Sequence, residues 1–313
     1  MKHLFSYSVY QKLEDLSTDL GELFSDMGCD GLELLTSHIP VNKIFKPYTV
    51  TVHLPYSTDW YSVWNGGSYD MPESFARYYT YGKDREGILK TIRNMIEYAA
   101  PLEPEHGVIH ASNVDLRELR RKVYTHESSK VLNSFAEMMN EAVSVMKDGE
   151  PPFKLVFENL WWPGLRMLDN SDLRLLKKKI EFENWGICLD TGHLMNTLPG
   201  ITTQQEGIDA LLRIFDGYSQ DTKDAISAMH FHYSASGEYR NGFTETEYKG
   251  EPILEYINGS YHHINTLDQH LPFTDPRCKE LIDIIQPDHV IHELTGHGHS
   301  PIDDFKQQRS LLD

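Results

Sequence analysis

Short apolar runs alternate with longer segments of helical periodicity, and this alternation constrains the fold more than any other feature of the chain. The apolar runs are rich in β-branched residues and span 4–10, 31–35, 49–54, 107–111, 154–159, 186–190, 225–232 and 289–294. Helices are predicted over 11–27, 85–99, 128–147, 171–181, 205–217, 276–286 and 301–312. Repeated βα units build a parallel sheet. Eight of them, with no glycine-rich first turn, favour a closed (β/α)8 TIM barrel over an open sheet. We therefore predict one α/β domain over residues 1–313.

Two connections, 55–83 after the third strand and 233–275 after the seventh, are much longer than a barrel requires. Long ordered loops at the active face of a barrel usually shape a pocket. The first loop is rich in aromatic residues and begins next to His53. We predict that Tyr56, Trp60 and Trp64 contact the substrate there. Because aromatic residues also dominate subunit interfaces, burial of this segment in a homo-oligomer is the alternative.

The composition, with 40% hydrophobic and 24% charged residues, is that of a soluble globular protein. No apolar run is long enough to span a membrane, and the N-terminal residues lack the apolar core of a signal peptide. Cys29, Cys188 and Cys278 lie far apart and are odd in number, which argues against a disulfide framework. These features predict a cytoplasmic location. The formal net charge of -18 makes duplex DNA a disfavoured partner.

Ionisable residues stand where the predicted strands end, which in a barrel is the catalytic face. Each has an ordinary structural explanation, such as a helix cap or an ion pair, but together they form a ring with no lysine or arginine to neutralise it. Divalent cations would do so, and mixed imidazole and carboxylate ligands suit zinc, manganese or iron. The residues are His53, His110, Glu158, Asp190, His193, His230, His232 and Glu293.

The motifs Phe-Glu158-Asn159 and Leu-Asp190-Thr-Gly-His193, followed by His230 and Glu293, resemble the xylose isomerase-like TIM barrel superfamily. That superfamily contains sugar phosphate isomerases and epimerases, and also the endonuclease IV type of AP endonuclease (family 2). The isomerase pattern implies one divalent metal held by Glu158, Asp190, His230 and Glu293, with His193 on the substrate. The endonuclease IV pattern adds two histidines and an Asp-x-His, which this chain has as His53, His110 and Asp268-Gln-His270.

By the second resemblance, Glu158 would bridge two metals, and up to three Zn²⁺ would be bound. His53 and His110 would complete the first site, and Tyr56 matches a position nearby. The remaining assignments are Asp190, His230 and Glu293 to the second metal, and His193, Asp268 and His270 to the third.

The chain also departs from the endonuclease pattern. Phe-His232-Tyr follows His230, and Leu-Pro-Phe-Thr-Asp follows His270 in place of a glycine-rich continuation. These differences put the DNA-reading loops in doubt, and they leave open whether His230 or His232 is the ligand on the seventh strand. His232 shares a strand face with His230, and we predict that it contacts the substrate if it is not a ligand. His292 should point away from Glu293 and have a structural role, and His297 and His299 are expected in a loop.

Charge separates the two enzyme hypotheses. Four carboxylates with three divalent ions leave a site of about +2, which favours a phosphate and an attacking hydroxide. One ion with three carboxylates leaves about -1, which suits proton abstraction beside a sugar carbonyl. The leading hypothesis is a multinuclear hydrolase of a phosphoester on a small or nucleotide-like substrate, with Glu158 and Glu293 catalytic. The alternatives are a mononuclear sugar isomerase or epimerase using Zn²⁺, Mn²⁺ or Fe²⁺, and a barrel that binds metal or ligand without turnover.

Overall fold

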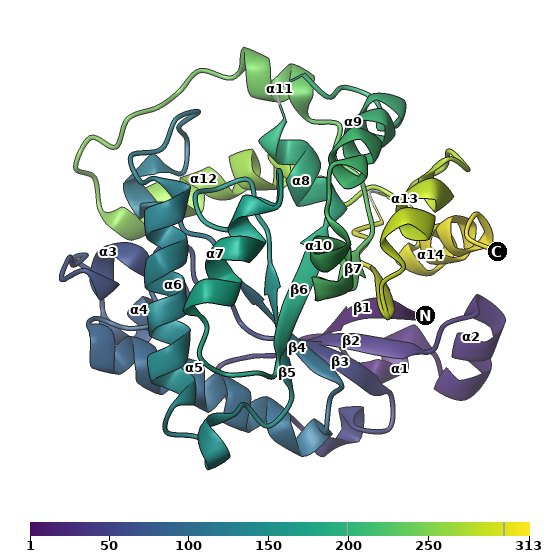
Figure 1. The fold of residues 1–313 in the computed structure, drawn as a ribbon, viewed down its shortest axis with the longest axis horizontal. Helices are drawn as coiled ribbons and strands as arrows, with labels where there is room; N and C mark the ends of the chain where they lie inside the picture. The colour runs from purple at the N-terminus through teal and green to yellow at the C-terminus, as the bar shows by residue number, and fades with distance from the viewer. Residues whose placement is uncertain (199, 297) are drawn as a thin grey trace.

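The computed structural model describes residues 1–198, 200–296 and 298–313, so that the expectation for His297 lies outside the described residues. Within them, parallel strands form a closed barrel in the order β1 to β8, and β8 pairs with β1 (Figure 1). The predicted (β/α)8 barrel is therefore confirmed. The strands are β1 (Lys2–Ser8), β2 (Gly31–Leu35), β3 (Thr49–His53), β4 (His106–His110), β5 (Lys154–Glu158), β6 (Trp185–Asp190), β7 (Ile226–His230) and β8 (His289–His292).

The helices form a ring around these strands (Figure 1). Those that match predicted segments are α1 (Leu13–Leu16), α2 (Leu20–Met27), α5 (Arg85–Ala99), α6 (Ser128–Val143), α7 (Ser171–Lys179), α9 (Gln204–Asp216), α13 (Cys278–Ile285) and α14 (Pro301–Ser310). Two further helices, α8 (Thr191–Thr197) and α10 (Gln220–Ala225), flank α9. Single 3-10 turns are η1 (Lys43–Phe45), η2 (Ala100–Leu102), η3 (Leu116–Glu118) and η4 (Lys147–Gly149).

The segment predicted as one helix over 11–27 is divided in two. Ser17 ends α1 in an extended conformation, and Asp19 begins α2 by accepting a hydrogen bond from the backbone N–H of Glu22 at 3.0 Å. An aspartate at this position satisfies a helix N–H that would otherwise have no partner. The cap therefore overrides a hydrophobic pattern that continues through the break.

The two long connections contain helices that the sequence did not predict. The first carries α3 (Tyr61–Trp64) and α4 (Glu73–Tyr79), and the second carries α11 (Gly237–Gly242) and α12 (Ile253–Leu267). Along α12 the buried face includes Ser260 and His263 beside apolar residues. Polar residues at buried positions weaken the apolar stripe by which a helix is recognised, so that this helix was not predicted.

The alternation of side chains along each strand separates the two faces of the barrel wall. Small apolar residues, among them Val156, Cys188 and Ala228, pack together inside the barrel. Phe157 points the opposite way and joins the larger core under the helices, where its ring meets Phe135 at 5.0 Å. Because a strand repeats every two residues, Glu158 shares the inward direction of Val156. The barrel interior is thus lined by apolar side chains along the middle of the strands and by ionisable side chains at their carboxyl ends.

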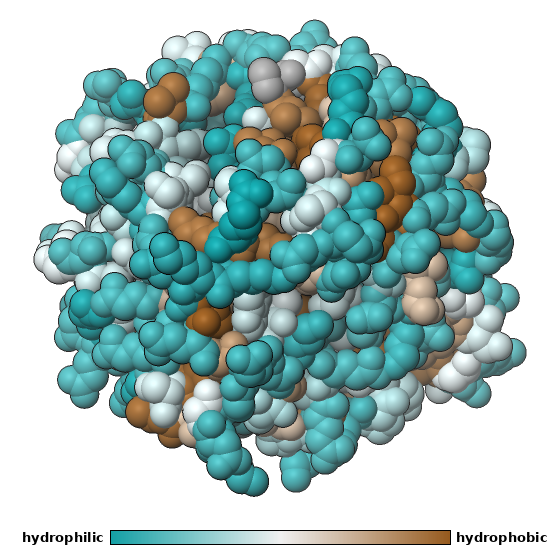
Figure 2. Space-filling view, viewed as in Figure 1, coloured by the Kyte–Doolittle hydropathy of each residue, from teal (hydrophilic) through white to brown (hydrophobic). Residues whose placement is uncertain are grey.

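The outer surface is predominantly hydrophilic on the face drawn in Figure 2, with hydrophobic residues visible as separate patches. In the described part of the chain, none of the helices combines the length and apolar character needed to cross a membrane.

Candidate metal centre

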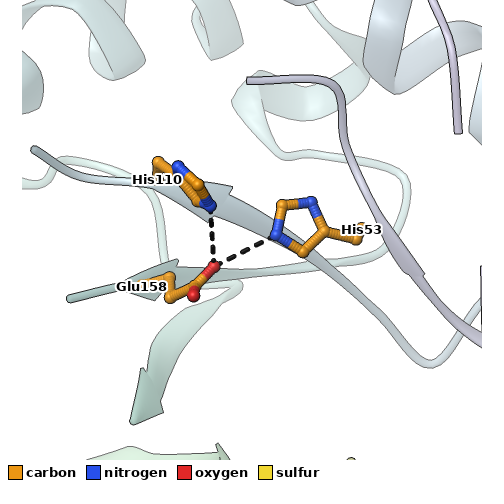
Figure 3. Close-up of side chains that lie close together, drawn as sticks. All are labelled: His53, His110 and Glu158. Atoms are coloured by element: carbon orange, nitrogen blue, oxygen red, sulfur yellow. Dashed lines mark hydrogen bonds and ion pairs between the residues drawn. The ribbon is translucent and has the colours of Figure 1, made fainter. Parts of the chain in front are cut away.

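Glu158, the last residue of β5, lies at the centre of the ionisable cluster and is fully buried. Figure 3 shows the imidazoles of His53 and His110 pointing at one oxygen of its carboxylate. The distances from Oε2 are 3.1 Å to His53 Nε2 and 3.2 Å to His110 Nε2. His53 ends β3 and His110 ends β4. Successive strand ends therefore deliver these three side chains to one point.

The second oxygen of Glu158 faces two more imidazoles. Oε1 lies 3.1 Å from His193 Nδ1 and 3.3 Å from His230 Nδ1. Burial works against the charge of Glu158, but the imidazoles of His110 and His230 hold the pKa of its carboxyl well below the usual range. Neither Oε1 nor His230 Nδ1 has a hydrogen-bond partner among the described residues. These atoms converge without bonding to one another, as ligand atoms around a common cation do.

Asp190 and Glu293 complete the surroundings of His230. Their carboxylate oxygens lie 3.6 Å and 3.1 Å from His230 Nδ1. Asp190 also begins α8 by accepting a hydrogen bond from the backbone N–H of His193 at 2.6 Å. Asn159 fixes this turn, because its amide accepts from the N–H of Asp190 at 2.8 Å and donates to its carbonyl at 3.0 Å. The Glu-Asn and Asp-Thr-Gly-His motifs thus form one hydrogen-bonded unit.

A further group forms where α12 ends. Oδ2 of Asp268 lies 3.2 Å from His193 Nε2 and 2.9 Å from His270 Nε2. His270 adopts a left-handed backbone conformation with φ of 50°, and its Nδ1 lies 3.0 Å from the carbonyl of Glu293. Burial opposes the charge of His270, but Asp268 and Glu293 raise its pKa to about 10.

Five overlapping groups of side chains have the spacing needed to hold a metal ion, with ligand atoms within 4.8 Å of one another. Two of them are His232, His270 and Glu293, and Glu158, Asp190 and His193; the other three are clusters that share no residue with one another. The membership of these three clusters is the one that the resemblance to endonuclease IV implies, and their role as ligands stays a prediction. The clusters are His53, His110 and Glu158; Asp190, His230 and Glu293; and His193, Asp268 and His270.

His232 lies in the same cluster, so that both histidines at the end of the seventh strand reach the site. Its Nε2 is 2.9 Å from Asp190 Oδ2, and its ring stacks on that of His270 at 4.1 Å. A Cβ at Gly192 would overlap the His232 ring. The glycine of the Asp-Thr-Gly-His motif therefore makes room for His232. Both histidines have the spacing of metal ligands, His230 with Asp190 and Glu293, and His232 with His270 and Glu293.

Glu33 is a functional candidate that the sequence analysis did not identify. It lies inside the barrel on β2, fully buried, with Oε1 2.9 Å from Nε2 of His230. Thr51 donates a hydrogen bond to Oε2 at 3.2 Å. A carboxylate on the second nitrogen of a ligand histidine fixes the orientation of the ring and increases its basicity. The available signal was one glutamate in the apolar run Gly-Leu-Glu-Leu-Leu.

The predicted substrate contacts occupy very different positions. Tyr56 is half-exposed, and its ring stacks on His110 with centroids 4.5 Å apart. Trp60 and Trp64 are buried, with Trp60 Nε1 donating to the carbonyl of Ser112 at 3.0 Å and the Arg85 guanidinium over Trp64. Their positions give no support to direct contact with a substrate. Trp60, Trp64 and Tyr81 of this segment belong to the core, whereas Tyr56, Phe75 and Tyr78 are exposed.

His292 lies away from the cluster, consistent with a structural role. It is buried, with Nε2 3.1 Å from His3 Nδ1, and its Nδ1 accepts a hydrogen bond from the Gln308 amide at 2.8 Å.

Solved structures match the chain over nearly its whole length. A D-tagatose 3-epimerase-like protein aligns with a TM-score of 0.53 and 19% identity over 100% of this chain and 96% of that chain. A candidate xylose isomerase from Rhodospirillum rubrum aligns with a TM-score of 0.57 and 13% identity over 100% of this chain and 98% of that chain. This chain has the fold of the xylose isomerase-like barrels. Endonuclease IV from Thermus thermophilus aligns with a TM-score of 0.50 and 14% identity over 100% of this chain and 99% of that chain.

Comparison of the sequence with protein families and with curated proteins gives no match. At these identities the structural likeness establishes the fold, and one fold supports many activities. The activity therefore has to be argued from the site.

Proposed function

We propose that the protein is a metal-dependent hydrolase that cleaves a phosphoester of a small or nucleotide-like substrate at a multinuclear centre. The observation that carries this proposal is the position of Glu158 between two pairs of imidazoles. One oxygen faces His53 and His110, and the other faces His193 and His230. A carboxylate shared in this way is suited to bridge two cations, and a single-metal site would have no use for His53 and His110.

The charge of the cluster supports more than one ion. Glu33 adds a buried carboxylate to the four that the sequence analysis counted. Five carboxylates against three divalent ions leave about +1, from +6 and -5, whereas a single ion leaves about -3 before the histidines are considered. Such an excess of buried negative charge would have to be relieved by protonated histidines. The carboxylates are Glu33, Glu158, Asp190, Asp268 and Glu293.

Divalent ions bound here would offset charge on phosphoryl oxygens and lower the pKa of a water molecule. Among the carboxylates of the cluster, Glu293 has the most exposed side chain, at 28%, against 15% for Asp268 and 1% for Glu158. It is thus the group best placed to reach a substrate or to accept a proton from the attacking water. Tyr56, stacked on His110 at the surface, is the aromatic residue best placed to contact the substrate.

The alternative function is a mononuclear sugar isomerase or epimerase. One observation favours it: Glu158, Asp190, His230 and Glu293 surround a common point even without the outer histidines. In that case a carboxylate would take a proton from the carbon next to a sugar carbonyl.

The metal content of the purified protein separates these functions. We expect more than one transition-metal ion per chain, approaching three after loading with zinc, measured by mass spectrometry of the metals. Glu158→Gln should release two ions together, because a neutral amide bridges cations poorly, and His270→Ala should release one. The matched control is His299→Ala, which removes an exposed imidazole and should leave the content unchanged.

Activity would be surveyed on phosphomonoesters, phosphodiesters and keto-sugars with zinc, manganese and iron. The proposal requires hydrolysis of a phosphoester that falls with the metal content of the variants. One ion per chain, unaffected by changes at His53 and His270 and accompanied by ketose epimerisation, would establish the alternative instead. Full metal content without turnover of any substrate class would point to a non-catalytic barrel.

We also propose that the chain works as a single domain in the cytoplasm. Cys29, Cys188 and Cys278 are all free thiols, which suits a reducing compartment.

A further inference from the structure

A cavity of about 310 Å³ opens on the same face of the barrel as the candidate metal centre. Its walls come from the segments that follow β4, β5 and β7, which all leave the carboxyl ends of the strands. We call this cavity the basic pocket. The residues that give it its character are Lys122, Tyr124, His126, Trp161, Arg166 and Arg240.

Trp161 connects the basic pocket to the metal centre. Its ring lines the pocket on one side and meets the ring of His193 edge-on, with centroids 5.2 Å apart, on the other. His193 in turn lies between Glu158 and Asp268. The pocket and the centre are therefore separated by the thickness of one aromatic side chain, which a substrate of modest size can span.

The charge of the basic pocket is opposite to that of the whole protein. The chain has 47 acidic and 29 basic residues, yet three cations line this cavity and none of its lining residues is an aspartate or glutamate. Among the described residues, neither Arg166 nor Arg240 has a carboxylate oxygen within ion-pair distance of its guanidinium. Asp172, near Arg166, accepts instead from the backbone N–H groups of Arg166 and Met167.

Parts of these guanidiniums are buried without a partner. Arg166 Nε and Arg240 Nη1 are both shielded from solvent and form no hydrogen bond among the described residues. Burial lowers the pKa of both arginines, and the two positive charges repel each other. Leaving a buried donor unsatisfied costs about 1–3 kcal/mol, and more for a charged group. Such an arrangement is unfavourable in the free protein and is relieved by a bound anion.

We propose that the basic pocket binds a phosphate group of the substrate that is distinct from the phosphoester cleaved at the metal centre. Two guanidinium forks match a doubly charged group with three terminal oxygens better than a single carboxylate. The Lys122 ammonium at the same cavity already donates to the carbonyl of Asn241 and contributes its charge. This assignment rests on the proposed function only in placing the reacting bond at the metal centre. The substrate would then be a small molecule that carries phosphate at two positions.

Titration calorimetry of the metal-loaded protein with inorganic phosphate tests the pocket. We expect the double variant Arg166→Gln, Arg240→Gln to bind phosphate at least tenfold more weakly at one site, the basic pocket, with its metal content unchanged. Glu158→Gln, which disturbs the metal centre, should keep that site. The charge-matched control is the double variant Arg174→Gln, Arg213→Gln, because both arginines are exposed, on α7 and α9, and it should bind phosphate like the unaltered protein. Acetate should bind the pocket more weakly than phosphate.

Thermal melting of the same variants tests whether the two arginines only stabilise the fold. Removing unpaired buried charges should leave the melting temperature unchanged or raise it. A lower melting temperature with unaltered phosphate affinity would mean that the arginines only hold the loops, and would overturn the assignment. Phosphate binding that disappears in Glu158→Gln and persists in the double variant would also overturn it. If the metal content proves to be one ion but the double variant still loses the phosphate site, the pocket stands while the proposed hydrolase fails.

Discussion

Glu33 lies inside the barrel directly behind His230 of the candidate metal centre. Oε1 of its carboxylate lies 2.9 Å from Nε2 of His230, at ion-pair distance but without the geometry of a hydrogen bond, while Nδ1 of the same ring faces Glu158, Asp190 and Glu293. The ring of His230 therefore has a carboxylate beside each of its two nitrogens. Burial opposes the charge of Glu33, but His230 and His106 keep the pKa of its carboxyl well below the usual range.

Replacing this carboxylate should weaken metal binding. Glu33→Gln keeps the shape of the side chain but loses the charge that orients and polarises His230, and we expect metal affinity to fall by roughly tenfold to a hundredfold. Competition with a chromophoric chelator measures the affinity directly. Glu280→Gln on the exposed side of α13 is the control. Equal affinity in the two variants would show that Glu33 serves only the packing of the barrel.

Gly192 is required by sterics at the same centre. A methyl group there would occupy the space of the His232 ring, and forcing extra volume into a packed interior costs about 1–3 kcal/mol. We expect Gly192→Ala to lower the free energy of unfolding by that amount and to weaken metal binding, measured by denaturant titration and metal analysis. An alanine variant with full metal content and unchanged stability would mean that His232 moves freely.

The strand-end residues could be predicted because each follows an apolar run directly, as Glu158 follows Lys-Leu-Val-Phe. Asp268 and His270 were found through the resemblance alone, since they follow a helix that the hydrophobic pattern conceals. Glu33 was missed because it stands inside its strand, where nothing in the sequence indicates that His230 lies opposite. Arg166 and Arg240 are far apart in sequence, so that only the fold brings them together.

At the scale of elements, a buried polar contact accompanies the backbone pairing of the first and last strands that closes the barrel. His3 on β1 and His292 on β8 bond to each other at 3.1 Å, and Gln308 on α14 donates to both His292 and the carbonyl of Phe231. Because the amide donates to Nδ1 of His292, its Nε2 carries the proton and donates to His3. This arrangement requires both rings to be neutral.

Acid should therefore destabilise this contact. Burial lowers the pKa of His3 from 6.5 to about 4, with Arg309 acting in the same direction and Asp30 against it. The unfolded chain binds the proton more readily, so that the contribution of His3 to stability is complete above pH 6.5 and is lost as the pH falls to about 4. The shift corresponds to a contribution on the order of 3 kcal/mol.

We expect His3→Gln to lose less stability than the unaltered protein between these pH values, measured by denaturant titration at each pH. The amide can still accept from His292 but does not titrate. His299→Gln, at an exposed position, should keep the original pH dependence. Identical pH profiles for all three proteins would show that His3 does not titrate differently in the folded and unfolded states.

The elements themselves were predictable where packing follows a simple period. Along α5, Ile88, Ile92, Met95 and Ile96 are buried at helical spacing, and Asp84 caps the first turn; the structure has the predicted bounds. The pattern failed where a turn or cap decides the outcome, as at Asp19, or where polar residues such as Ser260 and His263 fill a buried face.

At the scale of the whole molecule, the fold gives each basic residue between 117 and 122 an ion-pair or hydrogen-bond partner. Arg117 pairs with Asp115, and Arg121 lies within 3.6 Å of Glu245 and 3.5 Å of Glu247. Arg120 donates to Ser260, and Lys122 donates to the carbonyl of Asn241. The segment therefore offers few free cations to a polyanion. The unpaired arginines of the basic pocket are recessed in a cavity instead.

This distribution predicts that the protein does not bind duplex DNA tightly, despite sharing its fold with endonuclease IV. Phosphate contacts supply most of the affinity of a DNA-binding protein, and here a net charge of -18 opposes them. We expect dissociation constants above about 10 µM for a duplex with an abasic site at physiological salt, within or weaker than the nonspecific range. Fluorescence anisotropy with zinc-loaded protein measures this, with an intact duplex and a single strand for comparison. Submicromolar affinity for the abasic duplex, accompanied by cleavage, would overturn the prediction and show that the metal centre acts on DNA.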